Sequence, residues 1–422
     1  MKRNHSISLL KFNLLICFAF FQIIGCTYLN LSQSQEKPTQ DVIGNVYPGI
    51  DVLVERDFDI LQGKKVGLIT NHTGLSRNGV SDIDILFNTK KCTLAALFCP
   101  EHGIRGTADE KVESGKDEQT GLPLYSLYGK SNKPTKEMLE GIDVLVFDIQ
   151  DIGTRFYTYI GTMALAMKSA KENGKKFVVL DRPNTIGGKK VEGAIPPESM
   201  CGGLTSIYPI PTRHGMTIGE LALMFNDHFK IGCDLEVVKM KNWERRMYFD
   251  ETGLLWVNPS PNMKTLNGAI FYPGLGVSET SVSVGRGSER PFEMYGAPFF
   301  DSNKIADSLS KRNIPGVHFI PYSFTPSAKY HIFKDEKCNG VFAILYDREK
   351  FDSVTAGLHM IQAFYESNPD KYKVTDGLGM TGDKNAWDML TQQKLTPEEI
   401  VARWQPKIDE FKKIREKYLL YK

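Results

Sequence analysis

The sequence has no excess of either charge, and this absence limits its partners. Of its 422 residues, 52 are basic and 50 are acidic, and three of the basic residues fall within the first 25 positions, which hold no acidic residue. The remainder therefore has 49 basic against 50 acidic side chains. A nearly neutral protein has no electrostatic footprint for nucleic acid, so we expect neither DNA nor RNA as a partner.

Cofactor and metal motifs are also missing. The first apolar run is followed by NHTGLSRNG, which does not match the G-x-G-x-x-G of dinucleotide-binding folds. The segment GLPLYSLYGKS resembles a P-loop, but Leu124 stands where that loop needs its first glycine. The seven cysteines form no C-x-x-C pair and no Cys/His cluster with zinc spacing. We therefore expect no nucleotide, no other cofactor and no metal ion.

One long apolar run is present, and it lies near the N-terminus. A basic start precedes the apolar stretch 14–24, which is short for a membrane span and typical of a secretory signal. The run ends Ile-Ile-Gly-Cys, which resembles the bacterial lipobox with Cys26 as the lipidated residue; a plain signal peptide is the alternative. We expect a lipoprotein signal peptide over 1–25, a flexible tether over 26–45 and a lipid anchor in the membrane. The next residue is not acidic, which favours the outer membrane and a periplasmic location.

Short apolar runs recur along the first half of the chain. Their nearly continuous apolar cores are typical of strands buried on both faces of a parallel sheet. Between the last two runs, apolar residues at helical spacing predict a helix that stops near Gly174, which makes a βαβ unit. The predicted strands are 64–71, 92–102, 142–151 and 175–183, and a fifth follows at 233–243. A further helix over 217–229 opens with Thr217 and Glu220 in a capping-box pattern.

These patterns predict an α/β protein with two domains. Residues 46–255 read as a Rossmann-like, doubly wound parallel-sheet domain. The Pro- and Asn-rich segment NPSPNMKTL then marks a change of character, and residues 256–422 read as a smaller α+β C-terminal domain. Its expected elements are a strand at 337–346 and helices at 354–367 and 404–420.

Polar residues follow all four of the first predicted strands. Ligands of open parallel sheets bind beyond the carboxyl ends of the strands, so these residues indicate a site at one edge. Carboxylates, His, Arg and aromatic rings without a cofactor motif suit a sugar. The residues concerned are Asn71, His72, Glu101, His102, Asp148, Asp151 and Arg182.

Glycoside cleavage usually needs two carboxyl groups, one protonated and one ionised. Glu101 ends an apolar strand and is the candidate acid, with His102 beside it to orient it. Asp148 and Asp151 lie three residues apart past another strand end. The alternative for these two is structural, one capping a helix and the other pairing with Arg155.

Several long motifs carry a resemblance that runs from about residue 48 to the C-terminus. They resemble the YbbC family, whose characterised members are NamZ-type exo-β-N-acetylmuramidases. The resemblance implies a Rossmann-like domain and a smaller C-terminal domain with a cleft between them. It also implies an exo-acting glycosidase that releases N-acetylmuramic acid from non-reducing ends of peptidoglycan fragments. The motifs are VGLITNHTG, LFCPEHGIRG, FDIQDIGTRFYTY, TRHGMTIGELA, PSPNM and GVSETSVSVGRGSERPFEMYGAP.

The resemblance also implies roles for single residues. The family's proposed catalytic Glu lies in the PEHG motif, which here is Glu101, as general acid or acid/base. The second catalytic group stays open between Asp148, Asp151, Glu279 and the substrate's own acetamido group. Related sequences tend to read EGTN where this chain reads ETSV at 279–282, which makes the contacts there less secure.

The lactyl carboxylate of N-acetylmuramic acid calls for a cation, and Arg can grip it with two hydrogen bonds. Arg155, Arg286 and Arg290 are the candidates, each with an ordinary salt bridge as the alternative. The other candidate substrate-binding residues are Asn71, His72, Tyr157, Arg182, His214 and Asn262. The alternative function is a lipoprotein that binds sugar or cell-wall fragments without cleaving them. An esterase is disfavoured because the G-x-S-x-G elbow is missing.

Overall fold

Two β-sheets organise the chain, and the computed structural model describes residues 44–104, 113–329, 331–374 and 378–422. The larger sheet has seven strands, and every neighbouring pair is parallel except β3 with β4. In sheet order the strands are β3 (Gly115–Lys116), β4 (Pro123–Ser126), β2 (Thr93–Cys99), β1 (Lys65–Thr70), β5 (Val144–Asp148), β6 (Lys176–Leu180) and β7 (Leu235–Val238). The predicted signal peptide and most of the predicted tether lie outside the described residues.

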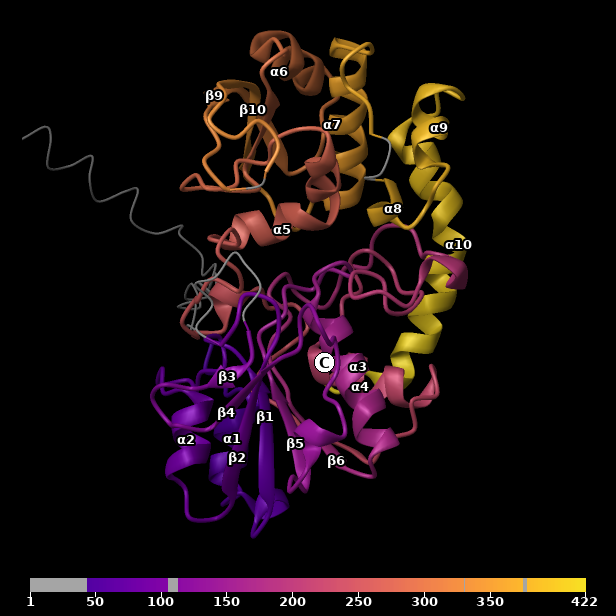
Figure 1. Cartoon of the computed structure of the whole chain (residues 1–422). Helices are drawn as coiled ribbons and strands as arrows, with labels where there is room; N and C mark the ends of the chain where they lie inside the picture. The colour runs from indigo at the N-terminus through magenta and orange to yellow at the C-terminus, as the bar shows by residue number, and fades with distance from the viewer. Residues whose placement is uncertain (1–43, 105–112, 330, 375–377) are drawn as a thin grey trace, which may run out of the picture. The chain divides into compact units, whose positions relative to one another are not determined.

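Helices pack on both faces of this sheet, as the continuous apolar runs predict. In β5, Val144 and Val146 face a core shared with α1 and α2, whereas Leu145 and Phe147 face the core under α3 and α4. Figure 1 shows the two pairs of helices on different sides of the strands. The doubly wound parallel sheet is therefore confirmed. The helices are α1 (Gly49–Glu55), α2 (Asp82–Asn88), α3 (Tyr159–Glu172) and α4 (Ile218–Asp227).

Two local signals in the sequence end or begin helices where expected. The Thr217 side chain accepts a hydrogen bond from the Glu220 N–H, and the Glu220 carboxylate accepts one from the Thr217 N–H, so the capping box of α4 is confirmed. Helix α3 ends before Gly174, whose φ of 62° lies in the left-handed region that glycine adopts without strain.

The second half of the chain forms a smaller antiparallel sheet with its own helices. Strand β10 pairs with both of its neighbours, in the order β8-β10-β9. Helices α6 and α7 pack together, and α6 also contacts β9 and β10. The elements are α5 (Leu266–Leu275), β8 (Met294–Ala297), α6 (Ser302–Lys311), β9 (Val317–Phe324), β10 (Cys338–Leu345) and α7 (Ser353–Ser367), followed by α8 (Leu378–Thr381), α9 (Ala386–Thr391) and α10 (Pro397–Arg415).

The C-terminal helix α10 begins earlier than its apolar pattern predicts. Thr396 accepts a hydrogen bond from the Glu399 N–H, and Pro397 occupies the first helical turn, where a missing N–H costs nothing. The helix also continues through Pro406. The apolar pattern predicts a start at residue 404, whereas the cap at Thr396 sets the observed start.

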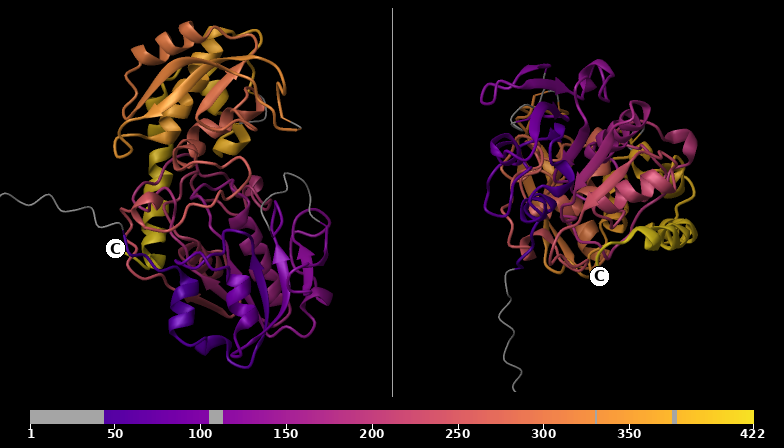
Figure 2. Two further views of the ribbon diagram at one scale, coloured as in Figure 1. Left: turned by 90° about the vertical axis from the view of Figure 1, so that its left-hand side faces the viewer. Right: turned by 90° about the horizontal axis from the view of Figure 1, so that it is seen from below.

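Helix α10 connects the region of the small sheet to the large one (Figure 2). It packs against α7, and near its other end the Arg415 guanidinium donates to the Gly188 and Gly215 carbonyls at 3.2 and 3.1 Å. The buried Glu192 carboxylate pairs with Arg213 and also accepts the N–H of Ser353 at the start of α7. The described residues therefore pack as one unit, and the boundary predicted after residue 255 stays a prediction.

Candidate active site

A cavity of about 390 Å³ lies beyond the carboxyl end of β2 and is closed by residues of the second half of the chain. Among the described residues, its walls contain two carboxylates, one arginine, two histidines and six tyrosine or phenylalanine rings besides smaller side chains. The lining residues are Glu101, His102, Tyr128, Phe156, Tyr157, Thr158, Tyr159, Thr205, Ser260, Met263, Tyr272, Glu279, Arg286, Phe292, His331 and Met380. Such a mixture of rings and polar groups suits a saccharide.

A tight turn brings Glu101 to this cavity. Strand β2 ends at Cys99, and the Gly103 N–H donates to the Pro100 carbonyl at 3.2 Å, which closes a turn around the Glu-His pair. His102 has φ of 70° and Gly103 has φ of 74°. A left-handed conformation at a histidine costs free energy, and such residues cluster at functional sites. The apolar strand therefore ends in a turn that places a carboxylate at the mouth of the sheet.

Two hydroxyl groups hold the Glu101 carboxylate. The Thr158 hydroxyl, one residue before α3, donates to Glu101 Oε2 at 2.7 Å. The Tyr128 hydroxyl also hydrogen-bonds to Glu101, and burial together with the charge on Glu101 raises the pKa of Tyr128 to about 12. The tyrosine therefore stays a hydrogen-bond donor at neutral pH. Glu101 is half-buried and fixed in direction, as a group that transfers a proton to a bound substrate must be.

Tyrosine rings form the inner wall beside Glu101. The Tyr157 and Tyr159 rings meet edge to face with centroids 5.0 Å apart, and Tyr272 packs against Tyr157 at 6.1 Å. The Tyr159 hydroxyl donates to the Pro259 carbonyl at 2.5 Å. Burial, and secondly the charge on Glu101, raises the pKa of Tyr159. These rings keep the wall rigid and offer apolar surface next to hydroxyl groups.

Another part of the wall is built around an ion pair between Arg286 and Glu279. The Arg286 guanidinium grips both oxygens of the Glu279 carboxylate, with Nη2 at 2.9 Å from Oε2. His331 Nδ1 lies 3.6 Å from Glu279 Oε1, and the guanidinium carbon lies 5.0 Å from the centre of the Phe292 ring. Because Arg286 hydrogen-bonds to both oxygens of Glu279, the guanidinium is held in the cavity wall.

Five of the candidates predicted from the sequence line this one cavity: Glu101, His102, Tyr157, Glu279 and Arg286. The others lie elsewhere in the fold. Asp148 and Arg182 form a buried bidentate ion pair in which Arg182 Nη2 is 2.9 Å from Asp148 Oδ2. This ion pair connects the ends of β5 and β6. The charges of Asp148 and Arg182 therefore compensate each other at the edge of the sheet.

Asn71 and Asp151 lie buried behind the tyrosine wall. The Asn71 carbonyl oxygen accepts from the Thr73 N–H at 2.9 Å, and its amide faces the Tyr159 hydroxyl. Asp151 Oδ2 accepts from the Gly153 N–H at 2.7 Å, and burial raises the pKa of Asp151 to about 7. Neither residue lines the cavity, so their contact with a substrate stays a prediction.

Arg155 is buried without a carboxylate partner among the described residues. Its guanidinium donates to the Thr205 carbonyl at 3.4 Å and to the Met380 carbonyl at 2.5 Å. Burial lowers the pKa of Arg155 to about 10, so it stays charged at neutral pH. Thr205 and Met380 both line the cavity, which puts this charge directly behind its wall.

The remaining candidates make local contacts outside the lining. His72 Nε2 is 2.7 Å from the Asn258 carbonyl, and Asn262 accepts from the Gly287 N–H at 2.8 Å. Burial, and secondly the Arg415 charge, lowers the pKa of His214 to about 3, so it is neutral. The half-exposed Arg290 side chain pairs with Glu293 at 2.7 Å.

Sequence reasoning missed several lining residues. Thr158 and Tyr159 belong to the motif FDIQDIGTRFYTY, which begins in a predicted strand. Their position after the end of that strand could have identified them as candidates. Tyr128 lies two residues beyond β4, a strand that the sequence analysis did not predict. Tyr272 and His331 come from segments with no strand-end pattern, and the tertiary fold brings them to this cavity.

The cysteines and the described helices add three findings. Cys92, Cys99, Cys201, Cys233 and Cys338 are all free thiols. In the part of the chain that the structure describes, no group of His, Cys, Asp and Glu side chains is arranged to hold a metal ion. Within the same residues, no helix is both long and apolar enough to cross a membrane.

In a comparison with known proteins, two models of one family match successive parts of the chain. Residues 66–267 match the family model of the N-terminal part of exo-beta-N-acetylmuramidase NamZ, and residues 270–421 match the model of its C-terminal part. A peptidoglycan beta-N-acetylmuramidase, NamZ, of Bacillus subtilis (strain 168) is 45% identical over 399 residues, which cover 92% of this chain and 93% of that protein.

Two solved structures are similar in fold. Both are DUF1343 family proteins from Bacteroides fragilis NCTC 9343. The first has a TM-score of 0.83 at 40% identity, and the second has a TM-score of 0.72 at 30% identity. Each match covers 90% of this chain and 99% of the solved chain. The two-sheet architecture is therefore shared with experimentally determined structures.

Proposed function

Because the chain belongs to the NamZ family of exo-β-N-acetylmuramidases, we propose that it is an exo-acting glycoside hydrolase that releases N-acetylmuramic acid from the non-reducing ends of peptidoglycan fragments. The observation that carries the proposal is Glu101. Its carboxylate stands at the carboxyl end of β2, is oriented by Thr158 and Tyr128, and faces a cavity walled by tyrosine rings and an arginine.

Glu101 acts as the general acid. It gives its proton to the glycosidic oxygen while the bond from that oxygen to the sugar's C1 breaks. Its carboxylate then accepts a proton from the water that completes hydrolysis. The hydroxyl groups of Thr158 and Tyr128 hold the carboxyl group in one orientation during both steps. Its proton therefore stays directed at the leaving oxygen.

The substrate's own acetamido oxygen is the nucleophile in this proposal. Among the described residues, the cavity lining contains one other carboxylate, Glu279, and Arg286 hydrogen-bonds to both of its oxygens. Asp148 is likewise committed to Arg182, and Asp151 lies behind the tyrosines. Attack by the acetamido oxygen on C1 followed by attack of water inverts the centre twice. NMR of the first product should therefore show the β-anomer; an initial α-anomer would refute this nucleophile.

Two cations account for selection of the lactyl group. Arg286 reaches the cavity directly and is held in place by Glu279. Arg155 adds a buried positive charge that no carboxylate of the described residues neutralises. A charge in a poorly hydrated setting acts over a longer distance than one in water, so Arg155 favours an anion in the adjoining cavity. N-acetylglucosamine, which lacks the carboxylate, gains nothing from either residue.

The test compares the parent with Glu101→Gln on a muramyl-glucosaminyl disaccharide. We expect the parent to release free N-acetylmuramic acid. The variant should keep the fold and bind the disaccharide without cleaving it. If the parent binds the disaccharide and releases no sugar, the alternative holds and the protein is a binding lipoprotein. If the variant cleaves as fast as the parent, Glu101 is not the acid.

The protein is further proposed to be a periplasmic lipoprotein of the outer membrane, anchored through Cys26. The support is the lipobox-like Ile-Ile-Gly-Cys after an apolar run, in a part of the chain outside the described residues. Metabolic labelling with a radioactive fatty acid tests it. Label should enter the parent and not Cys26→Ala, and the parent should fractionate with outer membranes. Equal labelling of both proteins would exclude Cys26 as the anchor.

A further inference from the structure

A second cavity, of about 620 Å³, lies beside the candidate active site. The two cavities share walls. Met380 lines the first and Gly382 lines the second, so only one residue of the α8 segment separates them along the chain. In the same way the loop that carries Met200 lines the second cavity and continues to Thr205 in the first. The second cavity is completed by α9 and by the first half of α10.

Three cations line the second cavity: Lys384, Arg403 and Lys407. Within the described residues none of them forms an ion pair. Arg403 makes only long contacts, at 3.4 Å, to the Met389 sulfur and the Gln393 side-chain oxygen. All three side chains are exposed, so an incoming anion can reach them without a rearrangement of the fold.

Asp383 is the one carboxylate among the described lining residues, so the three cations leave this lining with a net positive charge. Asp383 Oδ2 accepts the Trp404 indole N–H at 2.7 Å, and Oδ1 accepts the Asn385 N–H at 2.9 Å. Asp383 is therefore used to fasten the α8–α9 segment to α10. Apolar side chains such as Ile195, Met200 and Met389 line the cavity as well. Apolar surface beside cations fits an acidic sugar better than a small inorganic anion.

We propose that this second cavity binds a carboxylate-bearing glycan, and the inference rests on the proposed function. Each N-acetylmuramic acid unit without a stem peptide carries a free lactyl carboxylate, so a peptide-free glycan of several repeats presents further anions beyond the unit that is cleaved off. Lys384, Arg403 and Lys407 attract those anions. The glycan can be the distal part of the chain whose end occupies the first cavity, or a separate strand of the wall.

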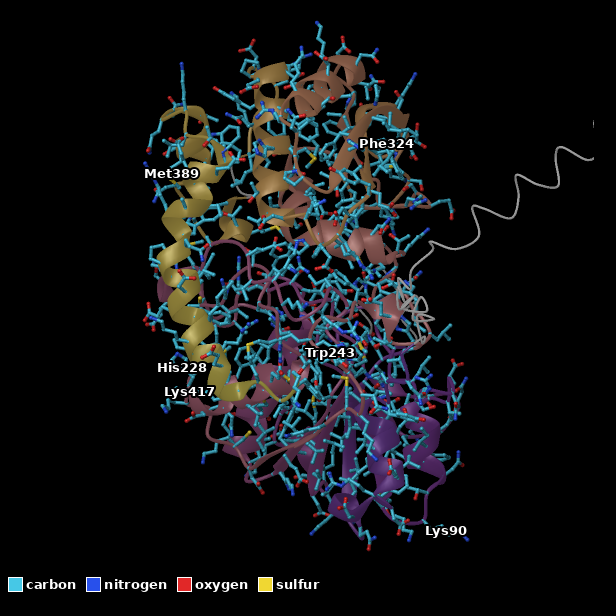
Figure 3. All side chains as sticks on the ribbon, turned by 180° about the vertical axis from the view of Figure 1, so that it is seen from behind. Lys90, His228, Trp243, Phe324, Met389 and Lys417 are labelled. Atoms are coloured by element: carbon cyan, nitrogen blue, oxygen red, sulfur yellow. The ribbon has the colours of Figure 1, made fainter. Side chains whose placement is uncertain are left out.

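The test reverses two of the charges and leaves the active-site residues untouched. The variant is Lys384→Glu with Lys407→Glu in the full protein. The matched control is Lys417→Glu, which changes an exposed lysine just beyond the end of α10. Figure 3 shows Lys417 far from Met389 of the second cavity. Three quantities are measured: hydrolysis of the disaccharide, hydrolysis of a peptide-free glycan of several repeats, and cosedimentation with insoluble peptidoglycan.

If the distal part of the same chain binds here, KM for the long glycan rises about fivefold to tenfold in the double variant, with kcat unchanged. Disaccharide hydrolysis stays within about twofold, and added salt raises the parent's KM for the long glycan in the same way. If a separate strand binds, both soluble substrates behave as in the parent and cosedimentation falls about tenfold.

Three results overturn the inference: no change in any of the three quantities, an equal loss for disaccharide and long glycan, or the same effect from Lys417→Glu. Failure of the proposed function looks different. A parent that does not cleave the disaccharide refutes the hydrolase, while cosedimentation of parent and double variant still decides whether the second cavity binds glycan.

Discussion

Asp151 makes the stability of the fold depend on pH. Its carboxyl group is buried behind the tyrosine wall, Oδ2 accepts the Gly153 N–H, and Oδ1 has no hydrogen-bond partner among the described residues. Gly153 has φ of 84°, and a Cβ there would lie 2.3 Å from the Asn184 side-chain oxygen, so this turn needs glycine. The turn therefore holds the carboxyl group in an apolar place without a cation.

The magnitude follows from the pKa of Asp151, which burial raises from 3.8 to about 7. Between these values the unfolded chain loses the Asp151 proton and the folded chain keeps it. The contribution of Asp151 to the free energy of unfolding is therefore fully present below pH 3.8. It falls as pH rises and is lost above about pH 7. The interval corresponds to about 4 kcal/mol, at about 1.4 kcal/mol per pH unit. Asn has the shape of the protonated group and no charge, so Asp151→Asn escapes this loss.

The assay is urea unfolding of the parent and Asp151→Asn at several pH values from 4 to 8.5. We expect the free energy of unfolding of the variant, relative to that of the parent, to increase as pH rises to about 7. Above that pH the difference should stay constant, whatever its value at pH 4. The exposed Asp388→Asn serves as the control, with a difference that stays flat. If the difference between parent and Asp151→Asn is also flat, the carboxyl group is not buried as described and the reasoning fails.

Four further predictions concern the site. Thr158→Val removes a hydroxyl from Glu101 and should lower kcat about tenfold with KM little changed; an unchanged kcat would contradict the orienting role. Glu279→Gln frees Arg286 and should raise KM about tenfold without abolishing turnover, whereas complete loss would make Glu279 a nucleophile. Gly103→Ala forces a side chain into φ of 74° and should cost about 1 kcal/mol or more in calorimetry; no loss would mean a relaxed turn. Arg155→Met should reduce binding of N-acetylmuramic acid and leave that of N-acetylglucosamine unchanged in calorimetric titration; equal losses would indicate a structural role.

The sequence predicts the parallel sheet well because burial on both faces leaves a local signature. Val144 to Phe147 is apolar at every position, and both sides of that strand are covered by helices. The two-residue strand β3 has no such signature, since it is exposed and pairs with one neighbour only. The capping box of α4 is likewise local, with both partners three residues apart.

The site is less visible because polar strand ends look alike in a sequence. Glu101 and Asp148 each follow an apolar run, yet Asp148 pairs with Arg182, whereas the partners of Glu101 within the described residues are the hydroxyl groups of Thr158 and Tyr128. That difference depends on which side chain arrives from another strand or loop. His331 shows the same limit, because it reaches Glu279 from a segment distant in the chain. Partner identity is a tertiary property, and spacing along one sequence does not encode it.

The central claim is that Glu101 protonates the leaving oxygen, and the choice of leaving group tests it most directly. Hydrolysis rates of parent and Glu101→Gln are compared on the disaccharide and on an aryl glycoside whose phenolate leaves without a proton. The account predicts that the variant loses about 10²- to 10⁴-fold on the disaccharide and far less on the aryl glycoside. Equal losses on both substrates, or no loss on the disaccharide, would contradict it.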